Sequence, residues 1–518
     1  MKKTFSQSMA WLHTWSGLIF GWILFAIFLT GSLSVFDREI SQWMQPESAA
    51  SQVPATTAVD RAADYLRNNH PDAPSWLIVP PSDRSATMLA YWQEGQEFPH
   101  VALDPATGKV AKRDTDGGHF FVHFHYQLHA GTIGTWIVGG VGLMMLIGLL
   151  SGIVIHKRIF KDFFTFRPRA GAQRSWLDAH NALGVLTLPF LLMITFSGLA
   201  IFAFMYLPSP VKLLYGDSLE DSEEFFHEAR PHVDLEPTDQ SAALLPLGGF
   251  VERTQQAFGT EQIWYISVDH PGDENAVVSL EPLYGEQLTL SNQLIQFRGI
   301  TGELLQKGMP FQPATHTQRV LTGLHFAQFG GAVTHWLYFI SGLVGTAMIA
   351  TGLLLFSVKR RRQIVLDSDV STGFLNVVDR LNVAAIAGPI LACLAYLWAN
   401  RLLPPGLAER PAWEIGAFFA VWALSLIHAL WRPARRAWLE QFTAAALLSL
   451  LLPLLNMLTS SQHLLVTLPA GRWRLAAVDL TVLALGLACV WLLRRLGMER
   501  QRTAVSGSAA PVWELADS

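Results

Sequence analysis

Residues 13–31, "HTWSGLIFGWILFAIFLTG", decide the fold, because the same pattern returns at residues 180–198 as "HNALGVLTLPFLLMITFSG". In both stretches a glycine follows the histidine by four residues, and a Thr-Gly or Ser-Gly pair closes the run 18 residues after the histidine. A mainly apolar run of about 20 residues is long enough to cross the membrane as a helix. The chain therefore contains a duplicated membrane-length segment.

A second pair of stretches repeats at another constant offset. Residues 125–152 and 325–352 both begin with histidine, and three glycines of the first stretch recur 200 positions later in the second. Both stretches run into long apolar segments. The duplicated unit is therefore a membrane span, a segment outside the membrane and a second span.

The composition is that of an integral membrane protein. Of the 518 residues, 51% are hydrophobic and only 15% are charged. Cys393 and Cys489 both lie in apolar runs, which excludes a disulfide framework and a thiolate metal site. We predict eight membrane spans, at residues 10–36, 131–156, 181–206, 334–357, 381–402, 412–431, 441–458 and 475–496.

Basic residues flank these spans on alternate sides. They gather in "HKRIFKDFFTFRPRAGAQR" (156–174), "VKRRR" (358–362), "RPARR" (432–436) and "RRLGMERQR" (494–502). Lys and Arg accumulate on the cytoplasmic side of membrane proteins. We therefore expect a multi-pass protein with both termini inside, whose first span is a retained anchor and not a signal peptide.

Two long segments then lie outside the membrane, at residues 37–130 and 207–333. Both mix polar and apolar residues with strand-like stretches such as "SWLIVPP" (75–81) and "IWYISVD" (263–269). We predict one small α+β domain in each. The remaining parts are 1–36, 131–180, 181–206, 334–365, a four-span extension at 366–498 and a cytoplasmic tail at 499–518.

The duplication selects four histidines. Parallel repeats are commonly related by an axis along the membrane normal, which would bring His13 opposite His180 near the inside face and His125 opposite His325 near the outside face. Two facing imidazoles suit the axial positions of a haem iron in a helical bundle, and nearby glycines let a flat macrocycle approach the backbone. We predict two b-type haems in a mainly α-helical, duplicated four-helix bundle.

Other histidines have no counterpart in the second copy. His156 is the alternative ligand for the inner haem. His129 lies four residues after His125 and is a weaker ligand candidate; with His123 it could bind a metal ion, although zinc or copper normally requires three or four ligands. His119 and His335 also lack repeat partners, and we interpret His335 as an interfacial residue.

The chain resembles the PepSY-associated transmembrane family over about residues 5–365. The resemblance rests on "WLHTWSGLIFGW", "FHYQLHAGTIGTWIVGGVGLMMLIGLLSGIVIHKRIFKDFFTFRP", "WLDAHNALGVLTLPF" and "LHFAQFGGAVTHWLYFISGLVGTAMIATG", while "VALDPATGKV" is similar to the closing strand and turn of a PepSY domain. It implies a bacterial inner-membrane protein tied to iron acquisition. Some members bind b-type haem and reduce ferric siderophores in the periplasm.

With the paired histidines, this resemblance implies a transmembrane ferric-siderophore reductase. The His13 and His180 pair would receive an electron from the cytoplasmic side, and the His125 and His325 pair would pass it to Fe(III) at the outside domains. The cytoplasmic loops among the first four spans, at most about 25 residues long, are too short for a nucleotide-binding domain. The expected partners are ferric iron or siderophore, membrane lipid, and either quinol or a separate cytoplasmic reductase as electron donor; nothing indicates nucleic acid.

Two other functions stay open. A metal permease would carry charged residues inside its spans, and these are nearly absent from the first four. A regulatory protein whose PepSY domains bind a partner or protease fits the outside domains but gives no reason for the matched histidines. The acidic run "YGDSLEDSEEFFHEARPHVDLE" (215–236) could attract cationic iron species, although a solvated loop is the commoner interpretation of such charges.

Overall fold

The computed structural model of the chain consists of two compact units. The first consists of residues 1–44, 115–196 and 336–518, and the second of residues 45–114 and 197–335. The structure describes residues 4–48, 53–82, 84–95, 97–156, 172–216, 218–229, 231–260, 262–283, 288–289, 294–308, 312–327, 329–366 and 372–506.

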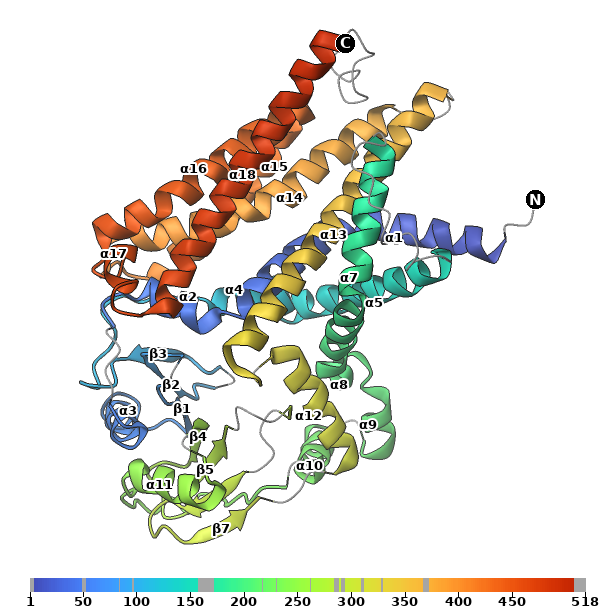
Figure 1. Cartoon of the computed structure of the whole chain (residues 1–518). Helices are drawn as coiled ribbons and strands as arrows, with labels where there is room; N and C mark the ends of the chain where they lie inside the picture. Colours follow the sequence, from blue (N-terminus) through green and yellow to red (C-terminus); the bar gives the residue numbers. More distant parts are fainter. Residues whose placement is uncertain are drawn as a thin grey trace. The chain divides into compact units, whose positions relative to one another are not determined.

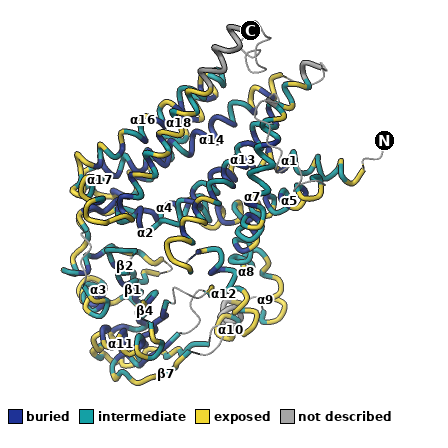
Figure 2. Tube along the Cα trace, in the orientation of Figure 1, coloured by how far each residue is buried: buried dark blue, intermediate teal, exposed yellow. Residues whose placement is uncertain are grey.

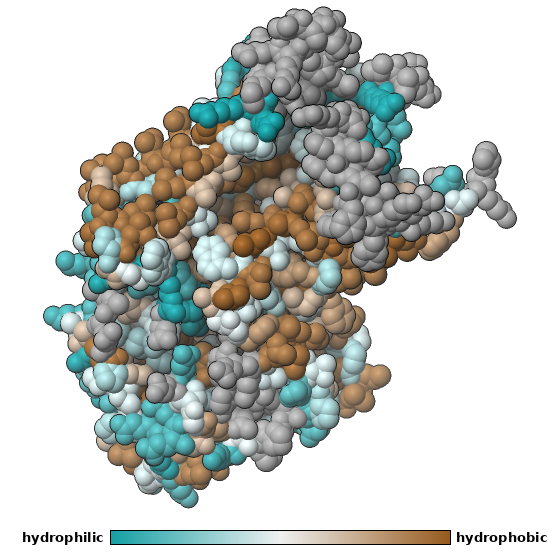
Figure 3. Space-filling view, in the orientation of Figure 1, coloured by the Kyte–Doolittle hydropathy of each residue, from teal (hydrophilic) through white to brown (hydrophobic). Residues whose placement is uncertain are grey.

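Eight helices in the described residues are long and apolar enough to cross a membrane, as predicted (Figure 1). They are α1 (Phe5–Ser34), α5 (Gly131–Ile155), α7 (Ala172–Ile201), α13 (Gly331–Leu366), α14 (Thr372–Leu402), α15 (Arg410–Trp431), α16 (Ala434–Thr459) and α18 (Trp473–Ser506). Leucines on α16 and α18 are exposed, and hydrophobic side chains cover the visible face of these two helices (Figure 3). Such faces are suited to lipid.

The third span differs from its predicted bounds of 181–206. Helix α7 begins about two turns earlier, at Ala172, and ends at Ile201, and the short helix α8 (Ala203–Tyr206) follows it. The sequence concealed the early start because those first turns carry Gln173, Arg174 and Asp178, which depress the hydropathy. His180 therefore lies well inside a continuous helix and not at its beginning.

The first four spans share one apolar core with the start of α14. Buried side chains from five helices meet there, including Leu18, Leu149, Leu191, Leu353 and Val378. A second core joins α14, α15, α16 and α18 to the short helices α2 (Asp37–Met44) and α4 (His119–Gln127). The short helix α17 (Leu464–Thr467) precedes α18.

Helix α14 is the most enclosed of the eight. Of its most apolar window, 78% is buried, and its tube is largely dark blue (Figure 2). Its sequence "NVAAIAGPILACLA" (382–395) is rich in small residues, which let neighbouring helices approach closely. At Gly388, for example, a Cβ would lie 2.4 Å from the Ser425 hydroxyl of α15. Helix α14 is thus the packing centre of the C-terminal extension.

The second unit is built on a seven-stranded antiparallel sheet of order β3-β2-β1-β4-β5-β6-β7. The strands are β1 (Ser75–Val79), β2 (Met88–Trp92), β3 (His100–Leu103), β4 (Ile263–Asp269), β5 (Val277–Pro282), β6 (Ile295–Arg298) and β7 (Leu304–Lys307). Helices α3 (Ala55–Asn69) and α11 (Leu247–Phe258) share one buried core with it. The unit also holds α9 (Ser209–Leu214), α10 (Leu219–Ala229) and α12 (Pro313–Phe326).

This sheet differs from the expectation of two separate small domains. Strand β1 pairs with β4, with Trp76 opposite Val268 and Ile78 opposite Ile266, so both outside segments share one sheet and one core. All four of these side chains are buried. The predicted outside segment 37–130 also divides, because α2 and α4 belong to the first unit and only residues 45–114 belong to the sheet unit.

Candidate functional site

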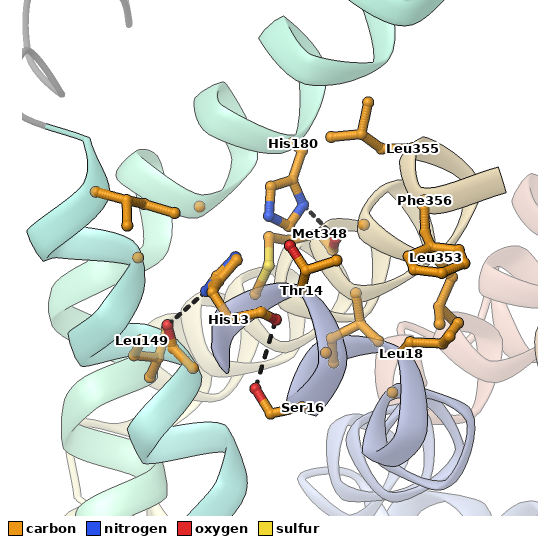
Figure 4. Close-up of a pocket in the computed structure, with 18 of the residues that line it drawn as sticks. His13, Thr14, Ser16, Leu18, Leu149, His180, Met348, Leu353, Leu355 and Phe356 are labelled. Carbon is orange, nitrogen blue, oxygen red and sulfur yellow. Dashed lines mark hydrogen bonds between the residues drawn. The ribbon is translucent and has the colours of Figure 1, made fainter. Parts of the chain in front are cut away.

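A cavity of about 510 Å³ opens among α1, α5, α7 and α13 of the first unit. His13 of α1 and His180 of α7 both line it, with ring centroids 6.2 Å apart and planes at 65°. Their imidazoles point toward one another across the open space (Figure 4). The volume lies within the ~300–1,000 Å³ typical of small-molecule and cofactor sites. The structure thus brings together the predicted inner pair.

Both imidazoles are held by the same kind of hydrogen bond. His13 Nδ1 donates to the Gly148 carbonyl at 2.9 Å, and His180 Nδ1 donates to the Met348 carbonyl at 2.9 Å. A carbonyl can only accept, so Nδ1 carries the proton and Nε2 keeps its lone pair, as a metal-ligating imidazole requires. The two carbonyls are 200 positions apart, so the sequence repeat is also a repeat of contacts.

Glycines give each ring its room. A Cβ at Gly152 would lie 3.3 Å from the His13 ring, and a Cβ at Gly352 would lie 3.0 Å from the His180 ring. Ser151 and Thr351, one residue before these glycines, place their hydroxyls 3.3 and 3.4 Å from the same Nδ1 atoms. The cradle is therefore duplicated as well.

Two neutral imidazoles that face one cavity are a donor set that a haem iron accepts. The walls are otherwise mainly apolar, with residues such as Leu24, Leu188 and Phe356. These residues fit a bis-imidazole haem.

Cationic residues lie at one end of the same cavity. Lys359 and Arg360 line it, together with Gln363 and His156. The Arg360 guanidinium lies 5.6 Å from the Phe356 ring centroid and 5.9 Å from that of Trp15. Haem carries two propionate carboxylates, for which these cations are suitable partners. In sequence the basic run 358–362 indicated only membrane topology, so the position of Lys359 and Arg360 in the cavity lining was missed.

His156, the alternative inner ligand, lines the cavity too. It is the residue that follows α5, where its backbone N–H donates to the Gly152 carbonyl. The rings of His13 and His180 face each other, and each Nδ1 donates a hydrogen bond to a backbone carbonyl. His156 therefore lies in the site but is not needed to complete the inner pair.

The two outer histidines have similar surroundings but belong to different units. His125 Nδ1 donates to the Ile27 carbonyl at 2.8 Å, and a Cβ at Gly31 would lie 2.5 Å from its ring. In the second unit, His325 Nδ1 lies 3.1 Å from the Ser197 hydroxyl, and a Cβ at Gly198 would lie 2.8 Å from its ring. Burial lowers the pKa of His125, which favours the neutral, ligating form. The pairing of His125 with His325 stays a prediction.

The neighbouring histidines of α4 do not form a metal cluster. The His119 and His123 rings lie 4.6 Å apart, while the His129 ring packs against Phe120 and Phe419. Within the described part of the chain, His123 and His129 do not converge with a third side chain of ligand type. A zinc or copper site there has no geometric support.

Comparison with known proteins identifies the family of the chain. The PepSY-associated TM region family matches residues 10–359, more than half of the sequence. The chain belongs to this family. An uncharacterised protein of Pseudomonas aeruginosa is 24% identical over 411 residues, which cover 74% of this chain and 97% of that relative.

The PepSY-associated region ends close to the end of α13, so the C-terminal helices α14 to α18 lie outside the family match. Two of them, α14 and α15, contact α4, which carries His125. Phe120, Phe121 and Phe124 of α4 are buried, and Phe120 stacks on Tyr396 of α14 at 4.6 Å between ring centroids. The extension therefore covers the apolar face of the helix that carries an outer histidine.

A buried polar network fastens the beginning of α4 to this extension. Arg410 and Glu414 form an ion pair that is fully buried, and Glu414 accepts hydrogen bonds from Asn400 and from Thr115, which lies four residues before α4. The Tyr396 hydroxyl donates to the Gly117 carbonyl at 2.8 Å. The buried charges of Arg410 and Glu414 therefore both have ionic or hydrogen-bonding partners, as buried charges require.

A second part of the network reaches α2. Arg401 donates to the Trp43 carbonyl and lies 3.7 Å from the centroid of the Trp43 ring. The Trp43 indole N–H donates to Asp479 at 3.1 Å, and Asn456 donates to the same carboxylate at 3.0 Å. Sequence reasoning left the extension without a role, because polar residues scattered over four spans have no common spacing.

Proposed function

We propose that this member of the PepSY-associated family is a b-type haem protein of a bacterial inner membrane that carries electrons outward to reduce ferric iron, with ferric siderophores as the substrate class. The observation that carries the proposal is the inner pair. His13 and His180 occupy matched positions of a duplication and face one cavity at 6.2 Å, each with Nδ1 tied to a backbone carbonyl.

The chain's own residues would bind and orient the cofactor. His13 and His180 would hold the haem through their Nε2 atoms, because the carbonyls that accept from Nδ1 keep Nε2 unprotonated. Lys359 and Arg360 would pair with the propionates at the cavity end. A haem iron held between two imidazoles carries one electron reversibly, and burial and axial ligation tune its potential.

The outer pair would hold the second haem, near the outside face. His125 would bind from α4, and His325 from the last turn of α12. The apolar face of α4, the helix that carries His125, packs against buried aromatic residues. Both termini would lie in the cytoplasm and the sheet unit in the periplasm, following the positive-inside pattern.

The proposed reaction transfers one electron to Fe(III) and gives Fe(II), without making or breaking a covalent bond in the protein. Siderophores bind through hard oxygen ligands, which hold Fe(II) more weakly than Fe(III). Reduction would therefore release the metal. Quinol in the membrane or a separate cytoplasmic reductase would supply the electron.

The competing functions have less support. A permease would need polar groups lining a path, whereas Arg401, Arg410, Glu414 and Asp479 are buried and bonded to partners within their own network. A purely regulatory membrane protein gives no reason for the duplicated histidine cradle. The reductase explains the cavity, the tautomers and the repeat together.

An acceptor experiment tests the function. The purified protein is reconstituted in vesicles, reduced without oxygen, and mixed with a ferric siderophore while the haem spectrum and Fe(II) release are followed. We expect reoxidation with one Fe(II) formed per electron lost, and a large loss of rate in His325→Ala. His316→Ala, on the exposed face of the same helix, is the matched control. A reduced protein that ferric siderophores fail to reoxidise would contradict the proposal.

A further inference from the structure

Three side chains of ligand type converge in the second unit, away from the four matched histidines in sequence. The ligand atoms of His227, His232 and Asp234 all lie within 4.8 Å of one another. His232 Nε2 lies 3.0 Å from Asp234 Oδ2, and the His227 and His232 rings lie 4.7 Å apart between centroids. They come from the acidic run 215–236, whose charges the proposed reductase does not use.

Two different backbone conformations bring them together. His227 lies in the last turn of α10, whereas His232 and Asp234 lie in the segment after it, which forms neither helix nor strand. Residues at i and i+2 of an extended segment project to the same side. Their hydrogen-bonding contact shows that His232 and Asp234 do so here.

The segment is anchored at the residue between these two ligands. Gln296 of β6 accepts a hydrogen bond from the Val233 N–H at 2.6 Å and donates to the Val233 carbonyl at 3.1 Å. Gln296 is itself buried and donates to Ser279 of β5. Gln306 of β7 donates to the Pro231 carbonyl at 2.8 Å. The sheet therefore fixes the position from which His232 and Asp234 project.

Two imidazoles and one carboxylate are a ligand set for divalent first-row transition metals. Ligand atoms on one such ion, at about 2.1 Å from it, lie about 3–4 Å apart, so the three side chains need only a small movement to close around it. We propose that His227, His232 and Asp234 form a divalent transition-metal site with open coordination positions. Fe(II) is the inferred occupant, an assignment that rests on the proposed ferric reductase function.

The exposure of the site suits exchange. His227 and Asp234 are exposed and His232 is half-buried. A structural metal site is normally closed by four protein ligands, whereas three ligands with open positions admit water or another ligand. Fe(II) released from a siderophore could therefore bind here transiently before import.

Calorimetric titration of the full-length, haem-loaded protein with Co²⁺ tests the site, using protein without a polyhistidine tag. We expect one saturable site per chain in the wild type. His232→Ala and Asp234→Asn should each weaken Co²⁺ binding by at least about tenfold. The double variant His227→Ala/His232→Ala should lose the site. His316→Ala and Asp72→Asn, at exposed positions of the same unit, are matched controls.

Absence of a saturable Co²⁺ site, or its persistence in the double variant, would overturn the proposal. Displacement of Co²⁺ by excess Fe²⁺ without oxygen would support the iron assignment, and failure of Fe²⁺ to displace it would overturn that assignment. The two proposals can be contradicted independently. A protein that binds Co²⁺ but no haem supports the metal site and contradicts the reductase. A protein that reduces ferric siderophores but binds no Co²⁺ supports the reductase and contradicts the metal site.

Discussion

His13 and His180 face each other across one cavity with their ring centroids 6.2 Å apart, although 167 residues separate them in the chain. Each ring donates from Nδ1 to a carbonyl of the span that closes its own copy of the repeat, and the two carbonyls are 200 positions apart. The duplication therefore preserves the histidine, its tautomer and the glycine beside its ring, and each of these can be tested.

Gly31→Ala should remove haem from the outer site alone. A Cβ at residue 31 would lie 2.5 Å from the His125 ring, so the ring must move away from its bonded position at Ile27. We expect the haem content per chain to fall to about half, measured by the pyridine haemochrome spectrum. Gly140→Ala, on an exposed face of α5 with open space around it, is the control. Full haem content in Gly31→Ala would contradict the assignment of His125.

Arg360→Ala should weaken haem binding at the inner site. Loss of one charged partner for a propionate should reduce affinity by about tenfold, the size of one hydrogen bond to a charged group. It should also lower the midpoint potential, because a nearby cation favours the reduced iron. Haem transfer to an acceptor protein and a redox titration measure both. Arg362→Ala lies outside the cavity lining and should change neither; equal effects of the two substitutions would argue against a specific contact.

Glu414→Ala should destabilise the C-terminal extension by about 3–5 kcal/mol, because it leaves Arg410 buried without its carboxylate. Thermal unfolding in detergent measures the loss. Asp64→Ala removes an exposed ion pair with Arg67 and should cost less than about 1 kcal/mol. Since Thr115 and the beginning of α4 depend on Glu414, outer haem should be lost before inner haem on heating. Simultaneous loss of both would contradict this coupling.

Ile78→Ala should destabilise both outside segments together. Ile78 is fully buried opposite Ile266, and removing its side chain leaves a cavity costing about 2–5 kcal/mol. Hydrogen exchange should show protection lost in β5 and β6 as well as in β2. Ser267→Ala, at a partly exposed position of β4, is the control. Loss of protection confined to residues 45–114 would indicate two independently folding domains.

The sequence repeat predicted the two histidines that line the inner cavity. Constant offsets of 167 and 200 residues predicted which histidines pair, and the eight spans followed from apolar runs of membrane length. Strands such as 263–269 were also expected from local patterns. These features depend on residues that are near one another in sequence or related by the duplication.

Long-range pairings were not predictable in the same way. The register of β1 on β4 joins residues about 190 positions apart with no local signal, and the polar start of α7 hid its first turns. Arg360 belongs to the basic run 358–362, which by itself indicates only membrane topology. His227, His232 and Asp234 bridge a helix end and an extended segment, so they follow neither helical nor strand periodicity.

The most direct test of the central claim is haem quantified per chain in the purified protein, with reduced-minus-oxidised spectra. We predict two b-type haems in the wild type. His13→Ala and His180→Ala should each lose the same one, while His125→Ala and His325→Ala should each lose the other; His316→Ala should keep both. A protein without haem, even when expressed in cells supplied with it, or one whose haem survives all four substitutions, would contradict the account.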